Sequence, residues 1–231
     1  MTKSHLLINA GGVGARVAGR CASRGERALE KIRVYFEEGR KVTFAVALDW
    51  PGWCRKAAGD EAALEAMEAY RGRYLAIAEE AALPHEFEVV GHIPGNSTTD
   101  FGAPDAVGPW DETPMEPEEI QRQALLVASC WRYFDSTADA APAELRKGPR
   151  GGGRDTAGVI SHVREAERAY ASKLGIRVAP RTSWEQQRSA LVNVLATGAR
   201  GGKWPPGYAM RRIAWHVLDH AWEIQDKGGL L

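Results

Sequence analysis

The most informative stretch of the chain is Arg212-Ile213-Ala214-Trp215-His216-Val217-Leu218-Asp219-His220. It places His216 and His220 four residues apart, among apolar residues at helical spacing. At 3.6 residues per turn, the two imidazoles project from one face of a helix and can share a metal ion. Ile213 and Ile224 flank them on the same stripe, so we expect the pair to face the protein interior.

A third histidine belongs to an earlier helical segment. His162 lies on a stripe with Val159, Val163 and Tyr170, so it is also predicted to face inward. Three neutral imidazoles from two helices would bind Zn²⁺, Ni²⁺ or a similar ion and leave a coordination position open for water or substrate. The alternative is that these are hydrogen-bonded core histidines, since a lone inward histidine is more often structural than a ligand.

Four amphipathic segments surround these histidines and predict an all-α four-helix bundle over residues 117–231. Asp155 or Thr156 is a suitable N-cap for the second helix, and Gly175 suits its C-terminal end. The four helices are predicted at about 118–139, 155–174, 183–196 and 207–227.

Residues 31–93 have a different pattern. Ile32–Phe36 and Val42–Leu48 are predicted strands around a short turn, and Phe87–Ile93 is a third strand. Between them, Asp60 opens one long predicted helix that continues to Ala78. The chain is therefore predicted to be α+β, with a small β-β-α-β module followed by a helical bundle.

Two other segments lack such periodicity. Residues 1–30 are basic, and we interpret them as a flexible N-terminal extension. Residues 94–116 are rich in proline and glycine, which predicts a linker. Phe101 and Trp110 are the side chains expected to pin that linker to a domain surface.

The composition excludes several classes of protein. Thirty basic and thirty acidic residues give a formal net charge of zero, so nothing indicates binding to nucleic acid or to a membrane surface. No apolar run is long enough to cross a bilayer. The three cysteines form no CxxC pair, which indicates a reduced, cytoplasmic protein without thiolate zinc sites.

The C-terminal half resembles the DinB-like superfamily of metal-binding four-helix bundles, which includes YfiT-type hydrolases and thiol-dependent S-transferases. The resemblance lies in Ile160–Glu167 and in Arg212–His220. It implies a metal triad of His162, His216 and His220. Zinc is the expected metal, and nickel and manganese are the alternatives. It also implies that the metal activates water or a low-molecular-weight thiol.

The N-terminal half resembles the HicB-like family in Asp49-Trp50-Pro51-Gly52-Trp53 and in the helix start Gly59–Ala66. The resemblance covers residues 31–93. It implies a module that docks a partner, covers a pocket or mediates self-association as a homodimer.

Several residues near the triad are candidates for supporting roles. Glu223 and Glu165 each follow a histidine by about one helical turn, so either is a candidate second-sphere acceptor or general base. The alternative is that both are solvated helix acids. Arg150 and Arg154 belong to a basic loop at a helix N-terminus, which is either an anion site or a flexible surface loop. Trp215 is a candidate pocket-lining residue.

Two functions follow from these expectations. The first is a metal-dependent enzyme that transfers a thiol, or adds water, to a small electrophilic substrate. The second is a metal-stabilised binding protein whose HicB-like module docks a partner protein. The number of metal ligands discriminates between them, because structural zinc sites are usually closed by a fourth ligand, whereas catalytic sites keep one position open.

Overall fold

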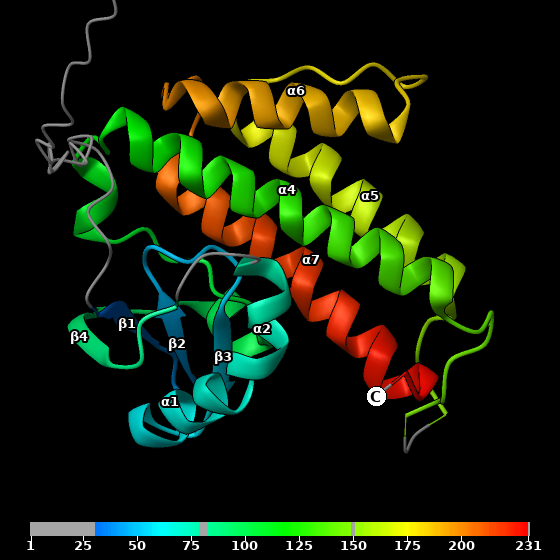
Figure 1. The fold of residues 1–231 in the computed structure, drawn as a ribbon, viewed down its shortest axis with the longest axis horizontal. Helices are drawn as coiled ribbons and strands as arrows, with labels where there is room; N and C mark the ends of the chain where they lie inside the picture. The colour runs from blue at the N-terminus through cyan, green and yellow to red at the C-terminus, as the bar shows by residue number, and fades with distance from the viewer. Residues whose placement is uncertain (1–30, 79–82, 149–150, 231) are drawn as a thin grey trace, which may run out of the picture.

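The computed structural model of the chain describes residues 31–78, 83–148 and 151–230. Within these ranges the chain forms a four-stranded sheet, seven α-helices and one short 3-10 helix (Figure 1). The predicted mixed α+β class is therefore confirmed. The proposed N-terminal extension lies outside the described residues.

The sheet is built from β1 (Ile32–Glu38), β2 (Thr43–Ala47), β3 (Cys54–Ala57) and β4 (Phe87–Pro94). Its order is β3-β2-β1-β4, and only the β1–β4 pair is parallel. The prediction of three strands was wrong, because β3 was missed. This strand has only four residues, two of them basic, and it pairs with β2 alone at the sheet edge. Its pairing partner, rather than its own composition, makes it a strand.

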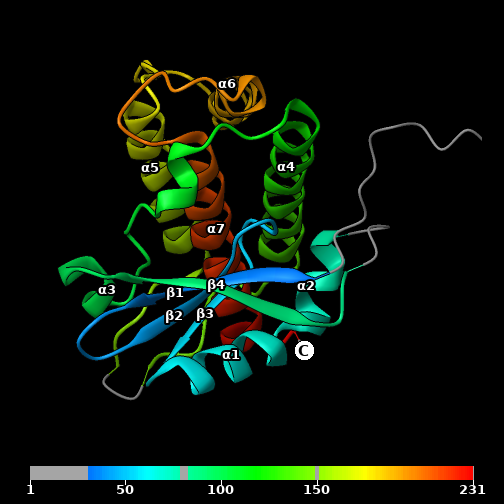
Figure 2. The ribbon, with the colours of Figure 1, turned by 90° about the vertical axis from the view of Figure 1, so that its left-hand side faces the viewer.

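The two central strands, β1 and β2, are covered on both faces, which explains the nearly continuous burial along them. Val34 and Phe36 belong to a core shared with α1 (Asp60–Ala69) and α2 (Arg71–Ala78). Tyr35 belongs to the cluster on the other face, which includes Trp215 from a long C-terminal helix. Figure 2 shows the sheet with α1 on one side and the long helices on the other.

The single long helix predicted from Asp60 was also wrong, because the helix breaks at Tyr70. The Met67 carbonyl accepts a hydrogen bond from Trp53 Nε1 at 2.9 Å and another from the Tyr70 N–H at 3.1 Å. A tight turn of this kind ends α1, and α2 begins at Arg71. The break follows from a tertiary contact with Trp53 that helical periodicity does not report.

The segment predicted as a linker contains α3 (Ser97–Phe101) and the 3-10 helix η1 (Pro109–Glu112). The expectation for Trp110 is confirmed, because its ring lies 4.6 Å from that of Tyr35 on the sheet. The expectation for Phe101 was wrong, since this residue is 91 % exposed. The buried carboxylate of Glu37 holds the segment through bonds from Thr99 and the Asp105 and Ala106 amides.

The remaining helices are α4 (Pro117–Ala140), α5 (Thr156–Lys173), α6 (Trp184–Thr197) and α7 (Pro206–Gly228). Asp155 caps α5 and Ser183 caps α6, each accepting a backbone hydrogen bond. These helices pack against one another, and α4 and α7 lie side by side in Figure 1. Most of α7 is buried, because it contacts the sheet as well as the other helices.

The Pro51-Gly52 turn is a point of contact between the N-terminal and C-terminal halves of the chain. The Pro51 carbonyl accepts a hydrogen bond from Tyr74 at 2.9 Å, and the position of a Cβ on Gly52 is 2.7 Å from Leu218 of α7. The turn therefore lies directly against α7, and one core extends from the sheet to the helices α4–α7. Among the described residues, no helix combines the length and apolar character that crossing a membrane requires.

Candidate metal centre

Three histidines converge between α5 and α7. One ring nitrogen each from His162, His216 and His220 lies within 4.8 Å of the others. The Nε2 atoms of His162 and His216 are 3.2 Å apart. Tetrahedral zinc with bonds of 2.0–2.1 Å would separate two ligand nitrogens by roughly 3.3 Å. The rings thus lie close to the spacing that one ion requires.

Local sequence accounts for half of this arrangement, and packing for the rest. His216 and His220 are neighbours on α7 because they are one helical turn apart. His162 reaches them because the buried Val159 and Val163 turn that side of α5 towards the protein core. The Tyr170 ring, two turns further along α5, lies 5.6 Å from the His216 ring. Packing against these apolar groups fixes the separation of the two helices at the site.

The electrostatic surroundings favour neutral imidazoles. Burial lowers the pKa of His216 well below its usual value, and the neighbouring His220 and Arg212 lower it further. Burial also lowers the pKa of His162, with His220 and Arg154 acting in the same direction. Metal binding requires the unprotonated ring, so these shifts keep lone pairs available for a cation.

Glu223 orients one of the three rings. Its carboxylate accepts a hydrogen bond from His220 Nδ1 at 2.8 Å, which leaves Nε2 of that ring as the free ligand atom. The hydrogen bond from His220, together with one from Lys227, lowers the pKa of Glu223 to about 2. By contrast, Glu165 is exposed to solvent. Of the two predicted acids, Glu223 alone contacts a histidine of the triad within the described ranges.

The three predicted anion-binding or pocket residues lie in different surroundings. Arg150 falls outside the described residues. Arg154 is exposed, and its Nη2 lies 3.5 Å from His162 Nδ1. Trp215 is 6 % exposed and packs edge-on against Phe44 of the sheet, 6.1 Å between ring centroids. Of the described residues in this set, Arg154 is thus the one whose side chain makes a polar contact with a histidine of the triad.

Sequence reasoning missed Arg212. It lies one turn before His216 on α7 and is 9 % exposed. Its guanidinium carbon is 4.6 Å from the Trp215 ring centroid and 5.4 Å from that of Tyr170. The signal was present in the sequence, since Arg212, His216 and His220 recur every four residues and so share one side of the helix.

A second group with metal-ligand chemistry lies on the surface. Glu38, Asp60 and His92 also bring three ligand atoms within 4.8 Å of one another. His92 Nδ1 is 2.5 Å from a Glu38 carboxylate oxygen, and all three side chains are more than two-fifths exposed. Solvent screening weakens such a cluster, and ion pairing explains it without a metal.

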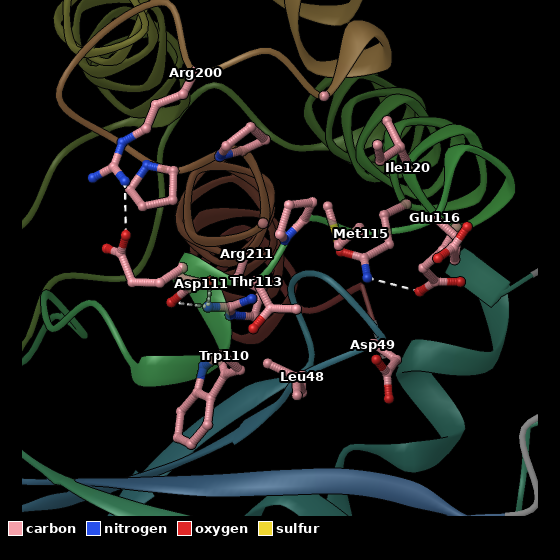
Figure 3. A pocket seen from close by; sticks show the side chains of 18 of the residues that line it. Leu48, Asp49, Trp110, Asp111, Thr113, Met115, Glu116, Ile120, Arg200 and Arg211 are labelled. Carbon is pink, nitrogen blue, oxygen red and sulfur yellow. Dashed lines mark hydrogen bonds and ion pairs between the residues drawn. The ribbon is translucent and has the colours of Figure 1, made fainter.

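A separate pocket of about 530 Å³ lies between the sheet and the N-terminal ends of α4 and α7 (Figure 3). Several of its charged side chains are paired with one another, as in Arg211 with Asp111 and Arg200 with Glu112. Arg211 precedes His216 by five residues, which places it about 140° around the helix. None of the three histidines lines this pocket. It is therefore distinct from the candidate metal centre.

Comparison with known proteins gives no family assignment. The chain matches no protein-family model. No curated protein and no solved structure shows significant similarity to it.

Proposed function

We propose that this chain is a metal-dependent enzyme of the DinB-like type, acting on a small electrophile with a low-molecular-weight thiol or water. The observation that carries the proposal is the three-histidine centre, because it joins ligands from two helices. Among the described residues no fourth histidine, cysteine, aspartate or glutamate joins this group. A three-ligand site with an open position is typical of catalytic rather than structural metal centres.

The residues fit a divalent ion of the zinc, nickel or manganese kind, with zinc preferred. A bound ion would supply Lewis acidity, lowering the pKa of water or a thiol so that the nucleophile forms near neutral pH. His162, His216 and His220 would hold it. Two of these imidazoles have lowered pKa values, which supports the proposal because protons compete less well with a metal.

In this proposal Glu223 is a positioning residue. Its hydrogen bond fixes the orientation of the His220 ring and raises the basicity of the opposite nitrogen. A carboxylate with a pKa of about 2 is a weak proton acceptor, so we do not assign it the role of general base. Glu165 faces solvent and has no assigned step.

We further propose that the HicB-like half supports α7 rather than acting independently. Arg55 of β3 forms an ion pair with Asp219, next to His220, at 3.0 Å. Its guanidinium also lies 5.4 Å from the centroid of the Trp222 ring. These contacts, together with the shared core, restrain the helix that carries two of the three ligands.

The test starts with untagged protein, since an affinity tag of histidines would itself bind metal. Elemental analysis should find stoichiometric zinc, nickel or manganese, and a panel of electrophiles with thiols or water should give turnover that a chelator abolishes. Tightly bound metal without any turnover would contradict the enzymatic proposal. Absence of metal after reconstitution would contradict the centre itself.

One observation favours the second candidate, a metal-stabilised binding protein. The strand β4 lies at a sheet edge, and its Val89 and Val90 are 47 % and 37 % exposed. An exposed edge with apolar side chains is suited to pairing with a strand of another protein. If this function holds, chelation should lower the melting temperature and release a bound protein partner, while no electrophile is consumed.

A further inference from the structure

Within the residues that the structure describes, the guanidinium of Arg212 is buried without an anionic partner. Its Nε and Nη1 atoms are fully buried and make no hydrogen bond within the described part of the chain. No carboxylate of that part lies within the 4.0 Å that defines an ion pair. This arginine therefore differs from its neighbour Arg211, whose Nη2 bonds both oxygens of the buried Asp111 at 2.7 and 2.8 Å.

An unpaired buried guanidinium is energetically unfavourable. Arginine stays protonated in proteins, so it cannot escape the desolvation cost by losing its charge. The faces of Trp215 and Tyr170 offset part of this cost, because both rings attract the cation. These contacts involve only the faces of the rings, so Nε and Nη1 of Arg212 still have no hydrogen-bond acceptor among the described residues. The donor capacity of Arg212 is thus left for an anion that does not belong to the described residues.

The position of Arg212 links that anion to the histidine centre. Arg212 and His216 are one turn apart on α7, and both contact the ring of Tyr170. A second cation, Arg154, lies beside His162. The only described carboxylate bonded to the triad is Glu223, which Lys227 already neutralises. The surroundings of the centre therefore attract negative charge, and a divalent cation would strengthen this attraction.

We propose that Arg212 binds the carboxylate of a small molecule that occupies the histidine centre. The inference rests on the proposed function and names the substrate class: one of the two reactants carries a carboxylate. A planar guanidinium suits a planar carboxylate, which can accept two parallel N–H bonds. The carboxylate belongs either to the thiol or to the electrophile, and paired ligands distinguish these two sources.

The test measures dissociation constants for two ligand pairs with wild-type protein, Arg212→Gln and Arg212→Lys. N-acetylcysteine and N-acetylcysteamine are thiols that differ by one carboxylate. Cinnamate and cinnamamide represent the electrophile with and without that charge. We expect wild-type protein to prefer the carboxylate of at least one pair by about 10- to 100-fold, the range for a charge-assisted hydrogen bond. Arg212→Gln should abolish the preference, and Arg212→Lys should restore only part of it.

The melting temperature distinguishes an arginine kept for ligand binding from one that stabilises the fold. Arg212→Met removes an unpaired buried charge, so its melting temperature should equal or exceed that of wild-type protein. Arg211→Met is the matched control on the same helix, and it should melt lower because it leaves Asp111 buried without its partner. Equal destabilisation by both variants would assign Arg212 a structural role and overturn the proposal.

Metal content, measured in every variant, separates this inference from the proposed function. Metal-loaded Arg212→Gln with an unchanged carboxylate preference overturns the inference and leaves the enzyme proposal intact. Metal-free wild-type protein that still prefers the carboxylate through Arg212 contradicts the metal centre but supports the anion site. Failure of wild-type protein to prefer either carboxylate overturns the inference.

Discussion

The Nε2 atoms of His162 and His216 lie 3.2 Å apart, although 54 positions separate the two residues in the sequence. Their meeting joins α5 to α7 at the candidate metal centre. A hydrogen bond between two neutral rings and a shared metal ion both fit such a distance. Removing each histidine in turn distinguishes the two, because only a shared ion is lost with any one of its ligands.

The substitutions His162→Ala, His216→Ala and His220→Ala should each remove one of three ligands and reduce bound metal to background after dialysis. His92→Ala is the matched control, because it removes a histidine from the exposed group with Glu38 and Asp60. Elemental analysis of the four variants gives the result. Loss of metal in His92→Ala alone would place the ion on the surface and contradict the centre between the helices.

Glu223→Ala should weaken metal affinity by about 10- to 100-fold, since the carboxylate that orients His220 is lost. Competition with a chromogenic chelator measures this change. Glu165→Ala removes an exposed acid from the neighbouring helix and should leave the affinity nearly unchanged. Equal effects of the two substitutions would mean that overall charge, rather than the bond to His220, sets the affinity.

Gly52→Ala should destabilise the fold strongly. Gly52 has φ of +92°, and an added Cβ would lie 2.7 Å from Leu218 Cδ1 and 3.2 Å from Ala214 Cβ. Gly59 has φ of +89° but nothing within 4 Å of an added Cβ. Gly59→Ala should therefore cost only backbone strain, roughly 1–3 kcal/mol. Gly52→Ala should exceed it by about 1–3 kcal/mol of overpacking, measured by urea unfolding. Similar decreases in the free energy of unfolding in both variants would show that α7 moves to accommodate the added Cβ at position 52.

Glu37 should make stability depend on pH. Burial raises its pKa above the usual value, despite the hydrogen bonds it accepts. The folded protein then holds this proton more tightly than the unfolded chain does. The contribution to the free energy of unfolding is thus fully present below the unfolded-state pKa and is lost as the pH rises through the folded-state pKa.

The difference in free energy of unfolding between wild-type protein and Glu37→Gln should accordingly decrease as the pH rises from about 4.5 towards neutrality. Denaturant titrations at several pH values measure it. Glu88→Gln, on the exposed side of β4, controls for the removal of one negative charge from the sheet. A difference that instead grows with pH would mean that the donors to Glu37 outweigh its desolvation.

Short-range patterns predicted much of the helical half. The four helices α4–α7 lie close to their predicted bounds, and Asp155, one of the two N-cap candidates for α5, occupies the cap. The i, i+4 spacing alone put His216 and His220 on one face. These features depend on backbone hydrogen bonds between residues a few positions apart, so a local pattern of side chains is enough to predict them.

Only the tertiary structure decided which of these faces meet. The strand β3 forms because it pairs with β2. The helix α1 ends where Trp53 donates a hydrogen bond to the Met67 carbonyl. Glu223 and Glu165 are alike in sequence terms, yet packing gives only the first a histidine partner among the described residues. Arg211 and Arg212 are adjacent, but within the described ranges only Arg211 bonds a carboxylate, that of Asp111, which lies 100 positions away in the sequence. Partners so distant in the chain are selected by the packing of the whole core, which local periodicity does not encode.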